Sequence, residues 1–150
     1  MKLEQLLTRL ARVEEAVFEA LAPKRQVDFS GRWQNEFGSV MDIHVAGATV
    51  TGTYTSMESS AGGAIRGPII GTTTGDIISF TVLWPSEPAK ITAWVGQLVV
   101  TAGSSSSQTE RLETLWQMIV NEPDAQDPDS LWTTIHAGAD HFWRIGETGE

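Results

Sequence analysis

The sequence predicts a mainly β protein, an eight-stranded antiparallel up-and-down β-barrel with an N-terminal amphipathic α-helix. From Phe29 onward, apolar and polar residues alternate with a period of two, which is typical of strands that bury one face. Turn signals rich in glycine, proline and serine divide this region into eight short runs. No stretch between the runs has the length of a crossover helix, and an antiparallel meander of eight strands closes most simply as a barrel.

Residues 1–22 predict a helix, because their apolar residues recur in steps of three and four. This spacing matches the a and d positions of a heptad pattern, and it is carried by Leu3, Leu6, Leu10, Val13, Val17 and Ala20. Pro23 ends the helix, so we divide the chain into a helix with its linker, 1–25, and a barrel, 26–150. The helix could lie on its own barrel, add a coiled-coil contact between copies, dock near the barrel mouth and limit access, or be a tag or a loose tail.

Each strand is expected between two turn signals, such as the Ala46-Gly47-Ala48 turn, Gly75, and the segments 85–88, 103–107 and 123–129. The expected strands are Gly31–Glu36, Ser39–Ala46, Thr49–Ser56, Gly67–Thr73, Asp76–Trp84, Ile91–Thr101, Arg111–Asn121 and Trp132–Arg144.

Composition narrows the function classes. The 150 residues carry a formal net charge of −9, which opposes binding to nucleic acid and to anionic membranes. The chain has no cysteine, which excludes disulfides and thiolate chemistry. No apolar run is long enough to span a membrane. The first residues lack the apolar core of a secretion signal, so as written the chain is expected to stay in the cytoplasm, and the true compartment is left open.

The strand faces combine tryptophan with small polar residues, because strand residues two apart share a face. Trp33 shares a face with Asn35, and Thr92 shares one with Trp94. Such a surface suits a small ligand with apolar bulk and a polar head. An ordinary aromatic core with satisfied hydroxyl groups explains the same pattern, so parity alone leaves both interpretations open.

No catalytic motif is present, and we expect no enzyme. The three histidines are His44, His136 and His141, and only the last follows a carboxylate directly, Asp140. Adjacent strand residues point to opposite faces, so that pair does not form a site. A metal site and a catalytic cofactor are likewise not expected.

One ordered set of motifs carries a family resemblance. The segment GRWQNEFGS covers 31–39, and GTYTS, FTVLW and TAWVGQ begin at Gly52, Phe80 and Thr92. Two LW pairs at 115–116 and 131–132 follow, and then GAD at 138–140. In order and spacing this set resembles the avidin/streptavidin family, from about Phe29 to Ile145.

The resemblance implies non-covalent, high-affinity biotin binding without chemistry. Asn35, Ser39 and Tyr54 match the residues around the ureido oxygen. Asp140 and Ser56 match the acceptors of the two ureido N–H groups. Three donors that converge on one carbonyl would favour a polarised urea.

The resemblance also implies an apolar wall. Thr92 matches the hydroxyl near the thioether sulfur, and Trp84, Trp94 and Trp116 match the tryptophans around the bicyclic ring and valeryl chain. Biotin combines a compact apolar bicycle with a polar urea, and these residues supply partners for both parts.

Three features bear on the carboxylate and on assembly. Ser59 and Ser60 fall where the family contacts the biotin carboxylate. Lys90 would pair with that carboxylate if it points inward, and would otherwise lie in solvent at a strand end. Trp132 matches the residue that a neighbouring subunit inserts as a lid, so the resemblance implies a homotetramer.

Two other function classes stay open. The barrel could bind a different small hydrophobic or ureido-like ligand, or it could be a scaffold in which the helix provides the activity through oligomerisation. Asn35, Ser39, Tyr54 and Asp140 favour biotin, since a lipid carrier has no need of four such polar groups.

Overall fold

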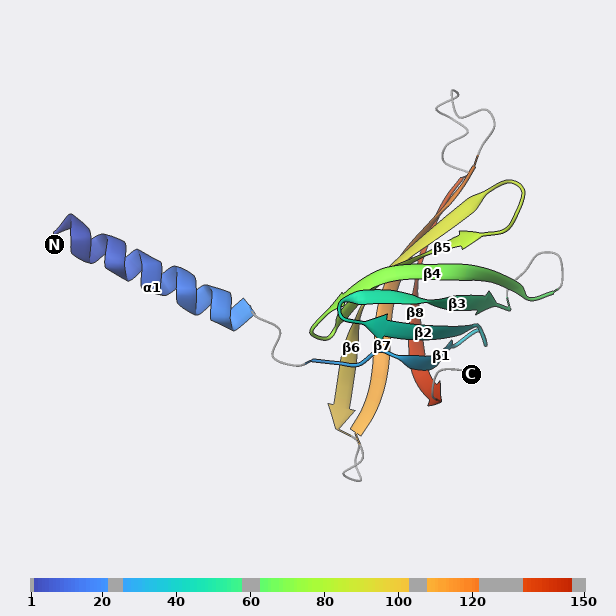
Figure 1. Ribbon diagram of the computed structural model, residues 1–150, viewed down its shortest axis with the longest axis horizontal. Coiled ribbons are helices and arrows are strands. Elements are labelled where there is room, and N and C mark those ends of the chain that lie inside the picture. The colour runs from blue at the N-terminus through green and yellow to red at the C-terminus, as the bar shows by residue number, and fades with distance from the viewer. Residues whose placement is uncertain (1, 22–25, 58–62, 103–107, 122–133, 147–150) are drawn as a thin grey trace.

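The architecture comes from a computed structural model of the chain (Figure 1). The structure describes residues 2–21, 26–57, 63–102, 108–121 and 134–146. Within α1 the side chains are described as far as Glu14.

One helix and eight strands make up the described chain. The helix is α1 (Leu3–Leu21). The strands are β1 (Gly31–Asn35), β2 (Val40–Ala46), β3 (Thr49–Ser56), β4 (Ile65–Thr74), β5 (Ile77–Trp84), β6 (Lys90–Ala102), β7 (Gln108–Val120) and β8 (Ile135–Gly146).

The strands form a closed barrel in which each strand pairs with its neighbours in sequence. All the pairings are antiparallel, and β8 returns to pair with β1, for example through Asn35 and Phe142. Closure leaves no unpaired sheet edge. The predicted fold class, an up-and-down β-barrel after an N-terminal helix, is therefore confirmed.

The strand bounds differ from the predicted ones mainly at β4, β7 and β8; β7 begins at Gln108, three residues before the predicted start at Arg111. β4 begins at Ile65, although Gly67 and Pro68 suggested a later start. The register with β5 begins only at Ile69, so Pro68 pairs with β3 alone and needs no second partner for a backbone N–H. β8 begins at Ile135, and the predicted start at Trp132 lies outside the described residues.

The up-and-down connections give the barrel two distinct ends. The turns β2–β3 and β4–β5 lie at one end, and residues 26–30 join them there, since Val27 N–H donates to the Gly75 carbonyl at 3.1 Å. We call this the closed end. The connections β1–β2, β3–β4, β5–β6 and β7–β8 lie at the opposite end, which we call the mouth.

Inward-facing aromatic and aliphatic side chains fill the closed end. Trp33 is fully buried, and its Nε1–H donates to the Phe29 carbonyl at 2.9 Å. The Arg144 guanidinium lies 4.3 Å from the centre of the Trp33 ring and donates to the carbonyls of Ser30 and Asp28 at 2.7 and 2.9 Å. Arg144 thus ties the segment before β1 to the last strand.

The outer surface carries an unusually apolar row across four strands. Leu83, Ile91, Ile119 and Ile135 are cross-strand neighbours on β5, β6, β7 and β8, and each is about half exposed. We call these four residues the apolar row. Val95 and Leu115 form a second outward pair on β6 and β7, at 58% and 71% exposure. Continuous exposed apolar patches are typical of surfaces that contact other molecules.

Helix α1 extends away from the barrel in Figure 1, on the side where β2 and β3 are joined. Every described side chain of the helix is exposed. The described part of the helix therefore does not pack on its own barrel, which was one of the three packings that the sequence left open. No helix in the described chain has the length and apolar character needed to cross a membrane.

Candidate functional site

A cavity of about 190 Å³ opens at the mouth of the barrel. At roughly 30 Å³ per water molecule, this space suits a compact ligand rather than a long acyl chain. Its lining combines aromatic side chains with hydroxyl, amide and carboxylate groups: Asn35, Phe37, Ser39, Tyr54, Ser56, Trp84, Thr92, Trp94, Trp116, Met118 and Asp140.

Asn35 is oriented by the tight turn that follows β1. Gly38 takes the left-handed backbone conformation, with φ 83°, so the chain can reverse directly after Asn35. The Asn35 side-chain oxygen accepts from the backbone N–H groups of Phe37 and Ser39 at 3.1 and 2.9 Å. With its oxygen held by the turn, the amide turns its NH₂ group toward the cavity, where it lies 3.3 Å from the Tyr54 hydroxyl.

Ser39 adds a third polar group beside Asn35 and Tyr54. Its hydroxyl oxygen accepts from the Met57 N–H at 3.1 Å. A hydroxyl that already accepts a bond is left with its proton to donate. Asn35, Ser39 and Tyr54 are all at least 95% buried, so a ligand oxygen between them would meet donors in a site with little water.

Asp140 supplies a carboxylate on β8 and is only 7% exposed. Trp94 Nε1–H donates to it at 3.4 Å, and the side chains of Trp116 and Asn35 also donate to it. Burial raises the pKa of Asp140 above its ordinary value; these three donors oppose the rise, and the charge of Glu36 adds to it. The backbone is fixed as well, because the Thr114 hydroxyl donates to the Asp140 carbonyl at 2.9 Å.

Glu36 is a second carboxylate beside Asp140, and the sequence did not identify it. Its Oε2 accepts from the backbone N–H of His141 at 3.0 Å and lies 3.9 Å from His141 Nε2. Glu36 follows the last residue of β1, so its side chain continues the β1–β8 pairing beyond the end of the strand. It therefore holds the backbone next to Asp140 and adds negative charge there.

Stacked aromatic rings form the apolar side of the cavity. Trp94 lies between Tyr54 and Phe80, with ring centres 4.9 Å away on each side. Trp84 meets Tyr54 edge to face at 5.5 Å, and its Nε1–H donates to the Thr92 hydroxyl at 2.9 Å. Packing and hydrogen bonds thus fix the rings before any ligand binds.

Trp116 lies against the backbone of the neighbouring strand. It is the cross-strand partner of Gly138, and a Cβ atom at Gly138 would come within 2.6 Å of its ring. The missing side chain therefore gives the indole its place beside the cavity.

Nine of the thirteen predicted site residues line this cavity, namely Asn35, Ser39, Tyr54, Ser56, Trp84, Thr92, Trp94, Trp116 and Asp140. Ser59, Ser60 and Trp132 lie outside the described residues. Lys90 is the first residue of β6, half-buried, and shares the parity of Thr92 and Trp94, but it does not line the cavity.

Two lining residues were missed. Met118 shares the face of Trp116, so its strand parity was a usable signal. Phe37 lies in the β1–β2 turn, where no period applies, and it is 53% exposed at the mouth.

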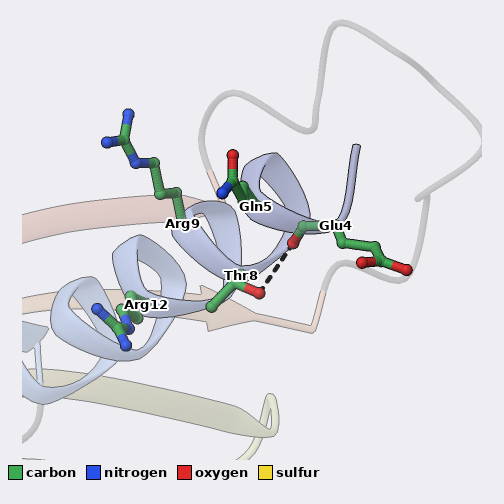
Figure 2. A pocket seen from close by; sticks show the side chains of 5 residues that line it. All are labelled: Glu4, Gln5, Thr8, Arg9 and Arg12. Atoms are coloured by element: carbon green, nitrogen blue, oxygen red, sulfur yellow. Dashed lines mark hydrogen bonds between the residues drawn. The ribbon is translucent and has the colours of Figure 1, made fainter. Parts of the chain in front are cut away.

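A second hollow lies along the polar face of α1 (Figure 2). It is lined by Glu4, Gln5, Thr8, Arg9 and Arg12, and the Thr8 hydroxyl donates to the Glu4 carbonyl. All five residues belong to one helix and are exposed, so nothing encloses a ligand there. Among the described residues, no cluster of three histidine, aspartate or glutamate side chains could hold a metal ion.

Comparison with known proteins agrees with this geometry. The profile of the Avidin family matches residues 23–145, which is most of the chain. The chain belongs to the Avidin family.

Solved structures extend the likeness of this Avidin-family chain. Xenavidin is 26% identical, with a TM-score of 0.63, over 81% of this chain and 100% of its own. Apo shwanavidin is 27% identical, with a TM-score of 0.60, over 78% and 100%. A shwanavidin variant in complex with biotin is 25% identical, with a TM-score of 0.59, over 79% and 99%. No curated protein matches the sequence.

Proposed function

We propose that this protein binds biotin non-covalently in the barrel cavity and catalyses no reaction. One observation carries the proposal: a cavity of about 190 Å³ brings three polar groups of Asn35, Ser39 and Tyr54 together with the carboxylate of Asp140, between tryptophan walls. Family membership supports it, as does the similarity to a shwanavidin variant solved with biotin.

In this proposal the ureido oxygen accepts hydrogen bonds from Asn35, Ser39 and Tyr54. The two ureido N–H groups donate to Asp140 and Ser56. Asp140 suits this role because a carboxylate in a site with little water is a strong acceptor.

The bicyclic ring and the valeryl chain lie in the apolar part of the cavity. Trp84, Trp94 and Trp116 contact them, and Thr92 faces the sulfur. From the family resemblance, the carboxylate would contact Ser59 and Ser60, and Lys90 at the start of β6 would add a positive charge. No catalytic cofactor or metal is needed.

Calorimetric titration with biotin, on protein freed of biotin carried through purification, tests the proposal. We expect tight binding with one site per chain. The Asp140→Ala variant removes a buried acceptor and should bind more weakly by about 1–3 kcal/mol.

Probes for the alternative ligands belong in the same series. Imidazolidin-2-one, the bare cyclic urea, tests recognition of the polar head alone, and a fatty acid tests a general apolar carrier. Binding of the fatty acid without biotin would favour the alternative, a barrel for another hydrophobic ligand. Unaltered biotin affinity in Asp140→Ala would contradict the role given to that residue.

We propose further that the chain forms a homotetramer in which Trp132 covers the site of a neighbouring subunit. The apolar row supports this, since it lies at the mouth end of β5–β8 and is exposed in the single chain. Trp132 precedes Ile135, the last member of the row, by three residues in the sequence.

The Trp132→Lys variant tests this arrangement, because it would bring a charge into an apolar lid. Light scattering and biotin titration should show weaker assembly together with weaker binding. Full affinity in subunits that have dissociated would contradict the shared lid.

A further inference from the structure

Helix α1 carries an apolar stripe that has no partner within the described chain. Leu3, Leu6, Leu10 and Val13 are between 45% and 70% exposed. A single helix of 19 residues is marginal in water, because most helical stability comes from burying an apolar face. A partner that buries the stripe would therefore stabilise the helix.

The spacing of the stripe indicates another helix as that partner. With Leu3 at position a, the a and d positions are occupied by Leu3, Leu6, Leu10, Val13, Val17 and Ala20. The opposite face carries Glu4, Gln5, Thr8 and Arg12, whose side chains project outward in Figure 2. The a/d repeat is uninterrupted and the back is mostly polar, with Ala11 and Phe18 at position b as exceptions, which fits a coiled-coil seam.

The charges beside the seam decide the orientation. Arg9 occupies position g and Glu14 the following position e. In a parallel in-register pair, each g residue faces the next e residue of the other helix. Arg9 of each helix would therefore pair with Glu14 of the partner subunit, which gives two symmetry-related ion pairs.

An antiparallel pair of the same helices lacks this complementarity. Aligning all its apolar layers sets Leu10 against a partner Val13, and each e position faces another e position. Leu7 would then lie beside a carboxylate and Arg9 beside Ala16, with no ion pair. We infer that α1 pairs with α1 of a second copy of this chain as a parallel, in-register coiled coil.

The point of attachment fits this pairing. Residues 26–30 enter at the closed end of the barrel, where Val27 bonds to Gly75. A parallel pair brings the C-terminal ends of both helices together, and with them the closed ends of two barrels. In an antiparallel pair the two attachment points would be separated by the helix length, about 28 Å at 1.5 Å per residue. The mouths stay open in the parallel arrangement, so the helix contact is separate from the lid.

The barrels also favour the pairing by mass action. Two barrels that associate through their own surfaces hold their helices at a high effective concentration, which lets a short coil form. The twofold axes of a tetramer pair the helices two by two. The inference that two helices join in each coiled coil rests on the proposed tetramer. The pairing of the helices does not depend on biotin binding.

Disulfide trapping in the full chain tests the inference directly, because the sequence contains no cysteine. Leu10→Cys places a thiol at the seam, and Thr8→Cys places one on the polar back of the same helix as a matched control. Under mild oxidation we expect Leu10→Cys to form covalent dimers at least tenfold faster than Thr8→Cys. Equal rates would overturn the inference.

Orientation is tested with a second position. Val13→Cys should also link to itself in a parallel pair. A co-refolded mixture of Leu10→Cys and Val13→Cys that links mainly between unlike chains would show an antiparallel pair and overturn the inference.

Charge reversal tests the pairing of Arg9 with Glu14. Adding Glu14→Lys to Leu10→Cys should slow dimer formation several-fold, and the further change Arg9→Glu should restore it. Failure to restore the rate would overturn the charge argument. Biotin titration of the same variants should be unchanged, so a failed helix contact is distinguishable from a failed ligand site.

Discussion

The carboxylate of Asp140 couples ligand binding to folding stability. Burial raises the pKa of Asp140 above 3.8, the value expected in the unfolded chain. Its contribution to stability is therefore fully present below about pH 3.8 and is lost as the pH rises through the folded-state pKa. At neutral pH the ligand-free protein holds a desolvated charge at Asp140, and in the proposed complex a ureido N–H would add a further donor to those of Trp94, Trp116 and Asn35.

Asp140→Asn tests this coupling. The amide keeps the shape but carries no charge, so we expect the ligand-free variant to be at least as stable as the wild type at neutral pH. The advantage should shrink as the pH falls toward 3.8. Urea unfolding at several pH values measures the difference. A variant that is less stable than the wild type at neutral pH would show that the bonds from Trp94 and Asn35 outweigh the desolvation.

Glu36 should set the pH range over which the site binds. In the proposed complex Asp140 is a stronger acceptor when it is ionised, so affinity should fall as the pH drops through its folded-state pKa. Burial is the main cause of the raised pKa of Asp140; Glu36→Gln removes the charge that adds to this rise and keeps an acceptor for the His141 N–H. We expect the loss of affinity to shift to lower pH.

Biotin titrations from neutral to acid pH measure that shift. Glu4→Gln, on the exposed helix, is the matched control and should leave the pH profile unchanged. His141 lies near the Glu36 carboxylate, so NMR should follow the protonation of His141 in the same experiment. If Glu36→Gln and the wild type had identical pH profiles, Glu36 would have no effect on the pH dependence of biotin affinity.

At the scale of the elements, the period-two pattern was enough to place every strand, since each buries one face in the barrel. It did not place the start of β4, because whether Pro68 is tolerated depends on which neighbour it pairs with. Likewise, parity grouped Trp94 with Thr92 but could not relate them to Asp140, 46 residues away. That relation requires the register across β6, β7 and β8.

The β7–β8 register predicts the effect of adding one methyl group. In Gly138→Ala the new Cβ would meet the Trp116 ring at 2.6 Å, so the indole must move. We expect a loss of stability of about 1–3 kcal/mol, as for other overpacked sites, together with altered tryptophan fluorescence and weaker ligand binding.

Gly146→Ala, in the same strand, is the control for that variant. No atom lies within 4 Å of the Cβ position there. If both alanine variants unfold at the same urea concentration, the close approach of Trp116 to the backbone is not important for stability.

At the scale of the whole molecule, we expect the closed end of the barrel to contribute to stability and the mouth to ligand binding, each independently of the other. Arg144→Met should destabilise the closed end by about 1–3 kcal/mol, through two lost hydrogen bonds and one cation–π contact. Ligand affinity should be nearly unchanged, since the cavity lies at the mouth. Thermal unfolding and biotin titration of the same sample measure both.

Arg66→Met is a suitable comparison for Arg144→Met, because Arg66 makes one exposed bond to Thr55. It should cost less stability than Arg144→Met. If Arg144→Met lost as much biotin affinity as a variant at the mouth, such as Asp140→Ala, the two ends of the barrel would be coupled.

The proposed assembly of copies would use the outer surface of the barrel. Ile119 lies in the middle of the apolar row, between Ile91 and Ile135, and is 49% exposed. Ile119→Lys should introduce a charge into an apolar contact between copies, so light scattering should report a smaller particle than the wild type. Ile70→Lys is the matched control: Ile70 is 66% exposed on β4, and its cross-strand neighbours are Thr51 and Thr81.

The particle mass decides between two roles for the row. A reduced mass in Ile119→Lys, with Ile70→Lys unchanged, would mean that the row is buried between barrels. If assembly also completes the mouth, biotin affinity should fall in step with the mass as the protein is diluted. A wild-type mass in Ile119→Lys would mean instead that the row is not needed for assembly, and that other contacts, such as α1 or the Val95–Leu115 pair, join the copies.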